Sequence, residues 1–396
     1  MHFLSYLLVP QIVSALAITQ RDTTNRAAYF LNDDPTGSSI VSLKISVQDG
    51  TVSDPILTST GGKGLQALTA SATAGVAPAP GGGDPLFVQD AVVVSGDYLF
   101  TVNAGSNTVS MFTIDPTNPW QPKLLSTASS QGEFPVSITY SAALKTACVV
   151  NGGAIAGVSC YSVDHAKGLT PITSLLPIPL NQTTPPVGPP GTVADILFNP
   201  SSTALFVTIK GMPPTPGFIV AWPVLSSGVI SSTPMISSPS ELVVDFSIDF
   251  LGSDSSAVIT DASYGASIVS ISPTFSVSVA VKTVIPNQGA SCWSAYSSRF
   301  NTIFVMDGGN PNITLLDPAT GAIKGVEVQD AAGKGSFDAK VDRNFLYVLR
   351  GGASVSVLDL TGLVGKGTSG MQVQSLDLSA LGSRALWTGM AIYPSS

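Results

Sequence analysis

The chain repeats one pattern of hydrophobic and polar positions seven times. In each copy a short apolar run ends in a polar residue, and a loop rich in Gly, Asn and Ser leads into a second strand. Runs of this length between turn residues predict β-strands, and a repeat of about 50 residues is typical of propeller blades. The apolar runs are residues 28–32, 99–103, 147–151, 205–210, 257–261, 303–307 and 346–350.

A further, inner strand is expected before most of these runs, near residues 87–94, 134–141, 193–199, 243–250, 291–297 and 336–342. No such strand precedes residue 28, and a matching one is found at residues 386–393. A ring completed by its own C-terminal strand leaves no exposed sheet edge between blades. The sequence therefore predicts an all-β, seven-bladed β-propeller, with its ring closed by the C-terminal strand completing blade one.

The N-terminal residues have the pattern of a secretory leader. Residues 3–14 are largely apolar and are followed by Ala15-Leu16-Ala17, an A-x-A cleavage site. We expect residues 1–17 to be a signal peptide, with a membrane anchor as the alternative, and residues 18–396 to form a single propeller domain. A secreted chain carries N-glycans at exposed sequons, and Asn181 and Asn312 begin two such triplets in predicted loops.

The charge balance narrows the range of partners. The formal net charge is −8, and charged residues make up only 11% of the chain. Without a basic stripe, nucleic acid is not an expected partner, and the leader is too short to span a bilayer. We therefore expect a secreted protein, without membrane insertion, that binds a small apolar organic substrate.

Three cysteines remain. Cys148 and Cys160 fall on two paired strands of the predicted third blade, where a disulfide would close a loop of about a dozen residues. Cys292 is then left over beside Trp293. We interpret it as a buried, inert thiol, because the sequence offers no nearby base for a nucleophile.

The histidines exclude several chemistries. There are two, His2 in the leader and His165 in a predicted turn. A histidine-based catalytic triad and a multi-histidine metal site are therefore not expected, and we predict no metal and no cofactor. Paired glycines at 152–153, 308–309 and 351–352 follow apolar runs, and we interpret them as turn residues with positive φ rather than as phosphate-binding loops.

Two apolar runs end in a cation, Lys210 in one and Arg350 in the other, whereas the remaining runs end in Asn or Asp. Asn and Asp cap the following turn, but Lys and Arg cannot accept the hydrogen bonds that capping requires. Their side chains either extend along the rim or direct a cation toward the channel, where it would polarise a substrate carbonyl. Lys210 and Arg350 are therefore our catalytic candidates.

One residue in each of six of the seven inner strands takes a position that can face the axis when the strands are aligned by their turns. We predict substrate-binding roles for these residues, although packing between blades is an alternative for the Trp side chains and backbone hydrogen bonding for the Asp side chains. A one-residue shift of register would present the other face. The candidates are Gln89, Asp195, Asp245, Trp293, Asp338 and Trp387.

Two loops are unusually long. Residues 61–84, rich in Gly, Ala and Pro, lengthen the first interval, and residues 183–190 form a Pro-rich loop before the fourth inner strand. Such loops are either insertions at blade rims or a lid over one mouth of the channel.

Some of these segments resemble a known family. Residues 102–112 look like the N-x-G-S-N-T-V-S blade signature of lactonase-type propellers, and residues 182–189 with 205–211 resemble secreted fungal 3-carboxymuconate cyclase-like proteins. Cycloisomerases of that superfamily use a channel histidine, which has no counterpart here. Secreted fungal relatives in tropolone–sesquiterpene biosynthesis act as hetero-Diels–Alderases, which require orientation and a carbonyl-polarising donor.

The leading hypothesis is therefore a cofactor-free enzyme of fungal natural-product biosynthesis. Its channel would orient an apolar reactive intermediate for stereoselective cyclisation or hetero-Diels–Alder cycloaddition, by proximity and polarisation. The alternatives are a non-enzymatic cell-surface interaction protein, and a lactonase or muconate-type cycloisomerase.

Overall fold

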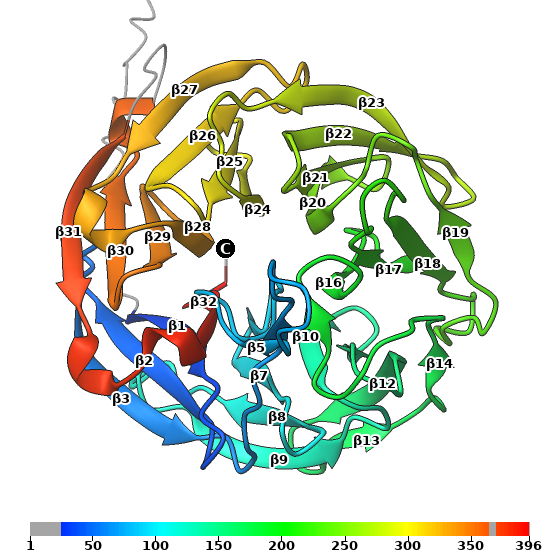
Figure 1. Ribbon diagram of the computed structural model, residues 1–396. Helices are drawn as coiled ribbons and strands as arrows, with labels where there is room; N and C mark the ends of the chain where they lie inside the picture. Colours follow the sequence, from blue (N-terminus) through cyan, green and yellow to red (C-terminus); the bar gives the residue numbers. More distant parts are fainter. Residues whose placement is uncertain (1–24, 364–369, 396) are drawn as a thin grey trace, which may run out of the picture.

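The structure is a computed structural model that describes residues 25–363 and 370–395. Within these residues the regular structure consists of β-strands and four short 3₁₀ turns, without an α-helix. The strands form separate sheets that stand around a common centre (Figure 1). The all-β prediction is therefore confirmed, whereas the expected signal peptide lies outside the described residues.

Seven of these sheets are antiparallel and contain four or five strands. One combines the two ends of the chain and contains β32 (Trp387–Tyr393), β1 (Arg26–Asn32), β2 (Ser39–Ile45) and β3 (Val52–Ser59). The next contains β6 (Val92–Ser95), β7 (Tyr98–Asn103), β8 (Thr108–Thr113) and β9 (Lys123–Ser129). A five-stranded sheet follows, with β10 (Pro135–Ser141), β11 (Thr146–Asn151), β12 (Gly157–Asp164), β13 (Gly168–Pro171) and β14 (Leu176–Pro177).

The remaining four large sheets follow in chain order. They are β16 (Val193–Phe198), β17 (Ala204–Ile209), β18 (Phe218–Pro223) and β19 (Met235–Ser237); then β20 (Asp245–Ser253), β21 (Ser256–Asp261), β22 (Gly265–Ile271) and β23 (Val277–Val284). The last two are β24 (Ser291–Ser297), β25 (Thr302–Asp307), β26 (Asn312–Leu316) and β27 (Ile323–Val328); and β28 (Ser336–Asp342), β29 (Phe345–Arg350), β30 (Ser354–Asp359) and β31 (Met371–Asp377).

Burial explains why these segments are strands. The second strand of each sheet is almost wholly buried, as in β11 and β17, because neighbouring sheets cover both of its faces. Such strands read as continuous apolar runs. Outer strands such as β31 instead alternate between exposed and half-buried residues, since one face meets solvent.

The innermost strands lie against one another around the centre. β6 contacts β10 and β32, β16 contacts β10 and β20, and β24 contacts β20 and β28. β28 also contacts β32, and β32 pairs with β1 from Asn32 opposite Trp387 to Ala27 opposite Tyr393. The two ends of the described chain therefore share one sheet.

A recurring irregularity marks the start of the innermost strands. The register with the second strand shifts between Val193 and Asp195, between Asp245 and Ile248, and between Ser291 and Trp293. Comparable shifts occur in β10 and β28. A β-bulge of this kind places an extra residue opposite its partner and redirects the side chains around it, so simple alternation does not hold where these strands begin.

Residues 84–91, here called the axial segment, occupy the centre of the ring. The sequence predicted a strand from residue 87, but β6 begins at Val92 because Phe87 (φ 57°) and Asp90 (φ 58°) turn the chain. All eight residues of the segment are buried. The segment contacts sheets on several sides of the ring, so it must lie near the axis.

Hydrogen bonds show how widely the axial segment is anchored. The Gln89 amide donates to the carbonyl of Ala194 in β16, and the Gln89 side chain accepts from the Ser294 amide of β24. The Asp90 carbonyl accepts from Ile138 of β10. Trp293 Nε1 donates to the Val88 carbonyl at 2.7 Å. The segment is therefore anchored to several of the sheets that stand around the centre.

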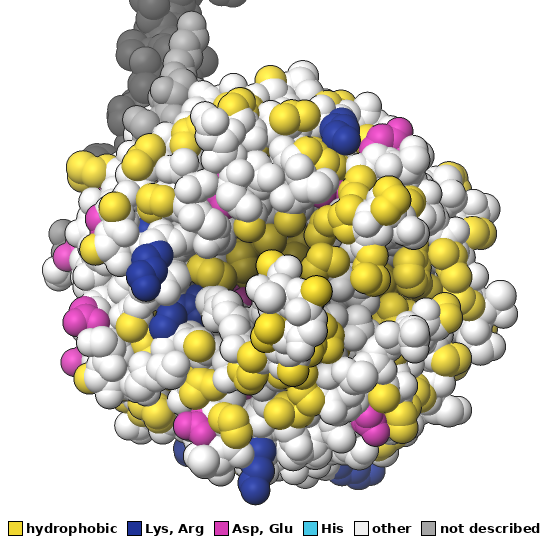
Figure 2. Space-filling model, viewed as in Figure 1, with side chains coloured by type: hydrophobic (Ala, Val, Ile, Leu, Met, Phe, Trp, Pro, Cys, Tyr) yellow, Lys and Arg dark blue, Asp and Glu magenta, His cyan; other side chains and the backbone are white. Residues whose placement is uncertain are grey.

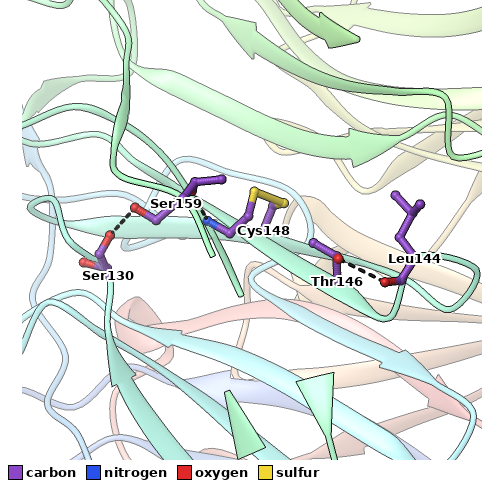
Figure 3. Close-up of a disulfide and its surroundings, with 7 residues drawn as sticks. Ser130, Leu144, Thr146, Cys148 and Ser159 are labelled. Carbon is purple, nitrogen blue, oxygen red and sulfur yellow. Dashed lines mark hydrogen bonds between the residues drawn. A yellow bond between two sulfur atoms is a disulfide. The ribbon is translucent and has the colours of Figure 1, made fainter. Parts of the chain in front are cut away.

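The disulfide prediction is confirmed. Cys148 in β11 lies directly opposite Cys160 in β12, with their Cα atoms 4.1 Å apart (Figure 3). Beside it, the Ser159 hydroxyl donates to the Ser130 carbonyl at 2.8 Å. The bridge therefore joins the fully buried β11 to a buried part of β12 within one sheet.

Two smaller predictions are corrected. The paired glycines at 152–153, 308–309 and 351–352 do not have positive φ. Several are required instead by close contacts: a Cβ on Gly308 would lie 3.0 Å from Trp293, and one on Gly153 would lie 2.5 Å from Thr184. Asn312 is not in a loop but is the half-buried first residue of β26, whereas Asn181 is exposed in a loop.

Candidate functional site

One mouth of the ring holds a cavity of about 270 Å³. Its walls come from the starts of the innermost strands, from residues that directly follow the second strands, and from the first half of the axial segment. Figure 2 shows hydrophobic side chains lining the hollow at the centre of this face. The large side chains on its wall are Phe87, Lys210, Phe246, Trp293 and Phe337.

The aromatic walls support one another. The Trp293 ring lies 5.0 Å from the Phe246 ring and 4.7 Å from the Phe337 ring, measured between centroids. The hydrogen bond from Trp293 to Val88 fixes the indole against the axial segment. A flat, apolar molecule can therefore stack in the cavity without first ordering its walls.

The two long loops meet above this cavity. β15 (Val187–Gly188) pairs with β4 (Leu68–Thr69), which also pairs with β5 (Ala79–Pro80), and together they form a small three-stranded sheet. Gly82 and Gly83 from one loop and Pro189 from the other line the cavity. Of the two interpretations given above, this placement favours the lid.

Lys210 is the cation on the cavity wall. Lys210 is 1% exposed. Its Nζ donates to the Val193 carbonyl at 2.6 Å and lies 4.5 Å from the centre of the Phe246 ring. It forms no salt bridge with any described residue. Burial lowers the pKa of Lys210 to about 7, despite the opposing effect of several buried acidic groups. Near neutral pH the amine can therefore both accept and donate a proton.

Two further ionisable groups lie near Lys210. Burial raises the pKa of the Cys292 thiol, which lines the same cavity, so the thiol stays protonated, as an inert cysteine would. Asp245 is fully buried, and its carboxylate oxygens lack a well-formed hydrogen bond to any described residue. Burial, reinforced by Asp261, raises the pKa of Asp245 well above its ordinary value, which favours the protonated form of this carboxyl.

Arg384 borders the same region, and sequence reasoning missed it. Its Nη1 donates to the Gly83 carbonyl at 2.5 Å, and its guanidinium lies 4.8 Å from the centre of the Phe337 ring. Burial lowers the pKa of Arg384 to about 10, although Asp84 opposes the shift. Arg384 therefore fixes the loop that forms one side of the cavity.

Arg350 is not brought to the cavity. It is fully buried, and its guanidinium donates to Gln329 and Ser356 and to the carbonyls of Asp330, Lys334 and Gly335. It thus holds the loop before β28 in place. The structure separates the two catalytic candidates: Lys210 lines the cavity and Arg350 does not.

The substrate-binding candidates are also divided. Trp293 lines the cavity, whereas Trp387 is fully buried and packs against Phe30 with tilted rings, their centroids 5.2 Å apart. Gln89 belongs to the axial segment. Asp195 accepts from the amide of Ile248 and from Ser137, as the backbone-bonding alternative proposed.

The bulges explain why neighbours of two predicted residues reach the cavity. Phe246 and Phe337 line it, while the adjacent Asp245 and Asp338 are absent from its lining. Asp338 instead accepts a hydrogen bond from the Asp90 amide. Both aromatic side chains were visible in the sequence, but assigning them to the cavity required the bulged register.

The opposite mouth has a different composition. A cavity of about 340 Å³ there is lined by Asp90, Lys340 and residues toward the ends of the innermost strands. Lys340 Nζ lies 2.7 Å from Asp90 Oδ1. Burial alone would lower the pKa of Lys340, but Asp90, Asp338 and Asp249 raise it above its ordinary value.

No cluster of three or more His, Cys, Asp or Glu residues in the described part of the chain is arranged to hold a metal ion. His165 is exposed in the turn between β12 and β13, where its ring is 6.3 Å from that of Tyr98. Among residues 25–363 and 370–395 there is also no helix long and apolar enough to cross a membrane.

The chain has solved structural counterparts with low sequence identity. The periplasmic gluconolactonase PpgL of Pseudomonas aeruginosa matches with a TM-score of 0.65 and 15% identity, over 93% of this chain and 99% of its own. A candidate 6-phosphogluconolactonase from Bacteroides fragilis matches with a TM-score of 0.60 and 11% identity, over 94% and 99% of the two chains. A second, from Bacteroides uniformis, has a TM-score of 0.59 and 14% identity, over 89% and 97%.

These matches define the class. The protein is similar in fold to lactonase-type β-propellers, and at these identities the similarity concerns the fold alone. No protein-family model matches the chain, and no curated protein does. The disulfide fits a protein of an oxidising compartment, either secreted or periplasmic.

Proposed function

We propose that the protein is an enzyme that opens or closes the ring of a small, apolar lactone in the cavity beside Lys210. One observation carries the proposal: a buried amine without a counter-ion lies on the wall of an otherwise apolar, aromatic cavity. The lactonase alternative lacked a histidine to transfer protons. A lysine with a pKa near 7 can supply that chemistry.

The proposed mechanism assigns Lys210 a proton-transfer role. As a neutral amine it accepts a proton from the water that attacks the lactone carbonyl. As an ammonium it returns that proton to the departing ring oxygen. Trp293, Phe246 and Phe337 hold the flat part of the substrate.

The cavity also specifies the substrate class. Its walls offer few hydrogen-bond partners, so burying the hydroxyl groups of a sugar lactone there would be costly. A volume of about 270 Å³ is at the small end for ligand pockets. Both features favour a lactone fused to one aromatic or unsaturated ring.

Stereoselective cyclisation or cycloaddition is the second candidate, because aromatic walls and a nearby cationic hydrogen-bond donor, Lys210, suit the orientation of a reactive carbonyl compound. The small cavity makes it the weaker candidate, since two substrates would have to enter together.

The proposal also includes the arrangement of the blades, secretion and glycosylation. We infer that the seven large sheets are the blades of one propeller and that β32 closes the ring; the contacts around the innermost strands support this. We also propose secretion with glycosylation at Asn181, which the disulfide and the exposure of that side chain support.

The test is hydrolysis of dihydrocoumarin, an apolar lactone, beside D-gluconolactone. We expect the wild type to turn over dihydrocoumarin, and Lys210→Met to lower kcat/KM about 100-fold or more. Lys63→Met removes an exposed lysine of the 61–84 loop and should leave kcat/KM unchanged. Equal turnover by Lys210→Met would overturn the role of Lys210. Failure to turn over or bind any lactone would favour the interaction protein.

A further inference from the structure

The surroundings of Lys210 are unusual for a lysine. Its Nζ has one hydrogen-bond partner among the described residues, the Val193 carbonyl, and lies 4.5 Å from the centre of the Phe246 ring, while the residue itself lines the cavity. An ammonium carries three donor hydrogens and is strongly hydrated in water. This site satisfies one donor and replaces the remaining hydration by apolar surface.

The nearby acidic group does not supply the missing counter-charge. Asp245 influences Lys210 electrostatically but forms no salt bridge with it. Its fully buried carboxyl lacks a well-formed hydrogen bond, and burial raises its pKa. Because Lys210 has no ion-pair partner among the described residues, burial favours the neutral amine, whose lone pair is nucleophilic.

An uncharged amine on the wall of a water-poor cavity is a nucleophile toward carbonyl carbon. Lysines desolvated in this way form Schiff bases. The cavity also favours the product. Phe246, Trp293 and Phe337 would flank a bound aromatic group, and their bulk restricts the access of water that would hydrolyse an imine.

We propose that Lys210 Nζ condenses with the aldehyde or ketone group of a small apolar ligand to form a reversible imine inside this cavity. The nitrogen attacks the carbonyl carbon and a carbinolamine forms. The carbonyl oxygen then leaves as water with the two hydrogens of the amine, and a C=N bond replaces C=O. No oxidant, reductant or cofactor is consumed.

This inference rests on the cavity of the proposed function but concerns a different reaction. In lactone hydrolysis Lys210 moves a proton, whereas here it bonds to the ligand. An aldehyde or ketone is the appropriate class because its imine is reversible. Direct attack on a lactone would instead leave a stable amide on the enzyme.

The test is reductive trapping with benzaldehyde and sodium cyanoborohydride. Benzaldehyde is small, aromatic and uncharged, and it lacks a conjugated alkene that could react with Cys292. Intact mass measurement should show addition of one benzyl group, and peptide mapping should place it on Lys210. At pH 7 we expect labelling at Lys210 to be about 100-fold faster than at exposed lysines such as Lys63, with a half-maximal rate near pH 7.

Two variants and one competition complete the design. Lys210→Met should lose the rapid phase, while Lys63→Met should keep it. Excess naphthalene, which fills the cavity without a carbonyl, should slow labelling of the wild type. Because the wild-type mapping needs no variant, a folding defect in Lys210→Met would not obscure the result.

The outcomes separate this inference from the proposed function. Labelling of Lys210 at the rate of exposed lysines would overturn the inference, even if lactone turnover still depends on Lys210. Rapid trapping at Lys210 in a protein that turns over no lactone would support the inference and count against the proposed function.

Discussion

Lys210 and Lys340 lie at opposite mouths of the same ring, yet their environments shift their pKa values in opposite directions. Lys210 contacts the Val193 carbonyl and the Phe246 ring through its Nζ, without a counter-ion among the described residues, so burial lowers its pKa to about 7. Lys340 forms an ion pair with Asp90 at 2.7 Å and feels Asp338 and Asp249 as well, so its pKa rises.

The difference shows that the counter-ion, and not burial alone, decides whether a lysine in this protein is a fixed charge. At the far mouth Lys340 holds the axial segment through Asp90. At the near mouth Lys210 has no such partner among the described residues, and it is the group to which we assign proton transfer and attack on a carbonyl. Under these proposals the two ends of the axis divide structural and chemical roles.

The largest effect on stability is expected from Lys210→Met. Burial lowers the pKa of Lys210 in the folded protein to about 7, below its ordinary value. Lys210 therefore lowers the free energy of unfolding by its full amount below pH 7, and this destabilisation disappears as pH rises toward 10. The variant should be about 3 kcal/mol more stable than wild type at pH 6, with little difference at pH 10. Urea unfolding at both pH values measures this; equal gains at both would contradict the shift.

Lys340→Met should have the opposite effect. It leaves Asp90 and its neighbouring carboxyls without a cation, and we expect a loss of about 2 kcal/mol at pH 8, reduced because Lys340 is partly exposed. At pH 5 protonated carboxyls should make the loss smaller. Urea unfolding at both pH values checks this. Lys324→Met, which removes a lysine from the outer strand β27, is the control.

Asp338→Asn should make the free energy of unfolding depend less steeply on pH. Burial raises the pKa of Asp338 to about 8, so the folded protein binds a proton that the unfolded chain releases near pH 4. Asp338 therefore stabilises most below pH 4, and that stabilisation is lost as pH rises to 8. The variant should lose less stability across this window, by up to about 1 kcal/mol per pH unit. The free energy of unfolding is measured at pH 5, 6 and 7 for both proteins. If it changes with pH by the same amount in wild type and variant, the assignment is refuted.

The smallest effect concerns the cavity wall. Trp293→Phe removes part of the stacking surface and the hydrogen bond to Val88. We expect KM for dihydrocoumarin to rise about fivefold, with a smaller change in kcat. Trp222→Phe, in a buried strand that does not line the cavity, should leave KM unchanged. If both substitutions act alike, the effect belongs to general stability.

Most strands could be predicted because burial on two faces leaves a clear mark. β11 and β17 are covered by sheets on both sides, so every position is apolar or small and the run is visible without an alignment. The disulfide followed from the same pairing. These features depend on neighbours that are close in sequence.

The site could be predicted only in part, because it depends on contacts between distant segments. Lys210 and Trp293 were identified by type and position. The roles of Phe246 and Phe337 depend on bulges, and the axial segment looked like a strand because its apolar residues conceal the turns at Phe87 and Asp90. The pKa of Lys210 depends on the absence of a counter-ion, which only the assembled ring determines.

The axial segment has a consequence for traffic through the protein. Residues 84–91 contribute to both cavities, Asp84 and Phe87 to the one beside Lys210 and Asp90 to the one beside Lys340, so they lie between the two. We therefore expect a product formed beside Lys210 to leave past the paired loops, by the route through which the next substrate arrives. Exchange is then sequential, a slowly departing product competes directly with substrate, and the two loops are placed to set the residence time of both.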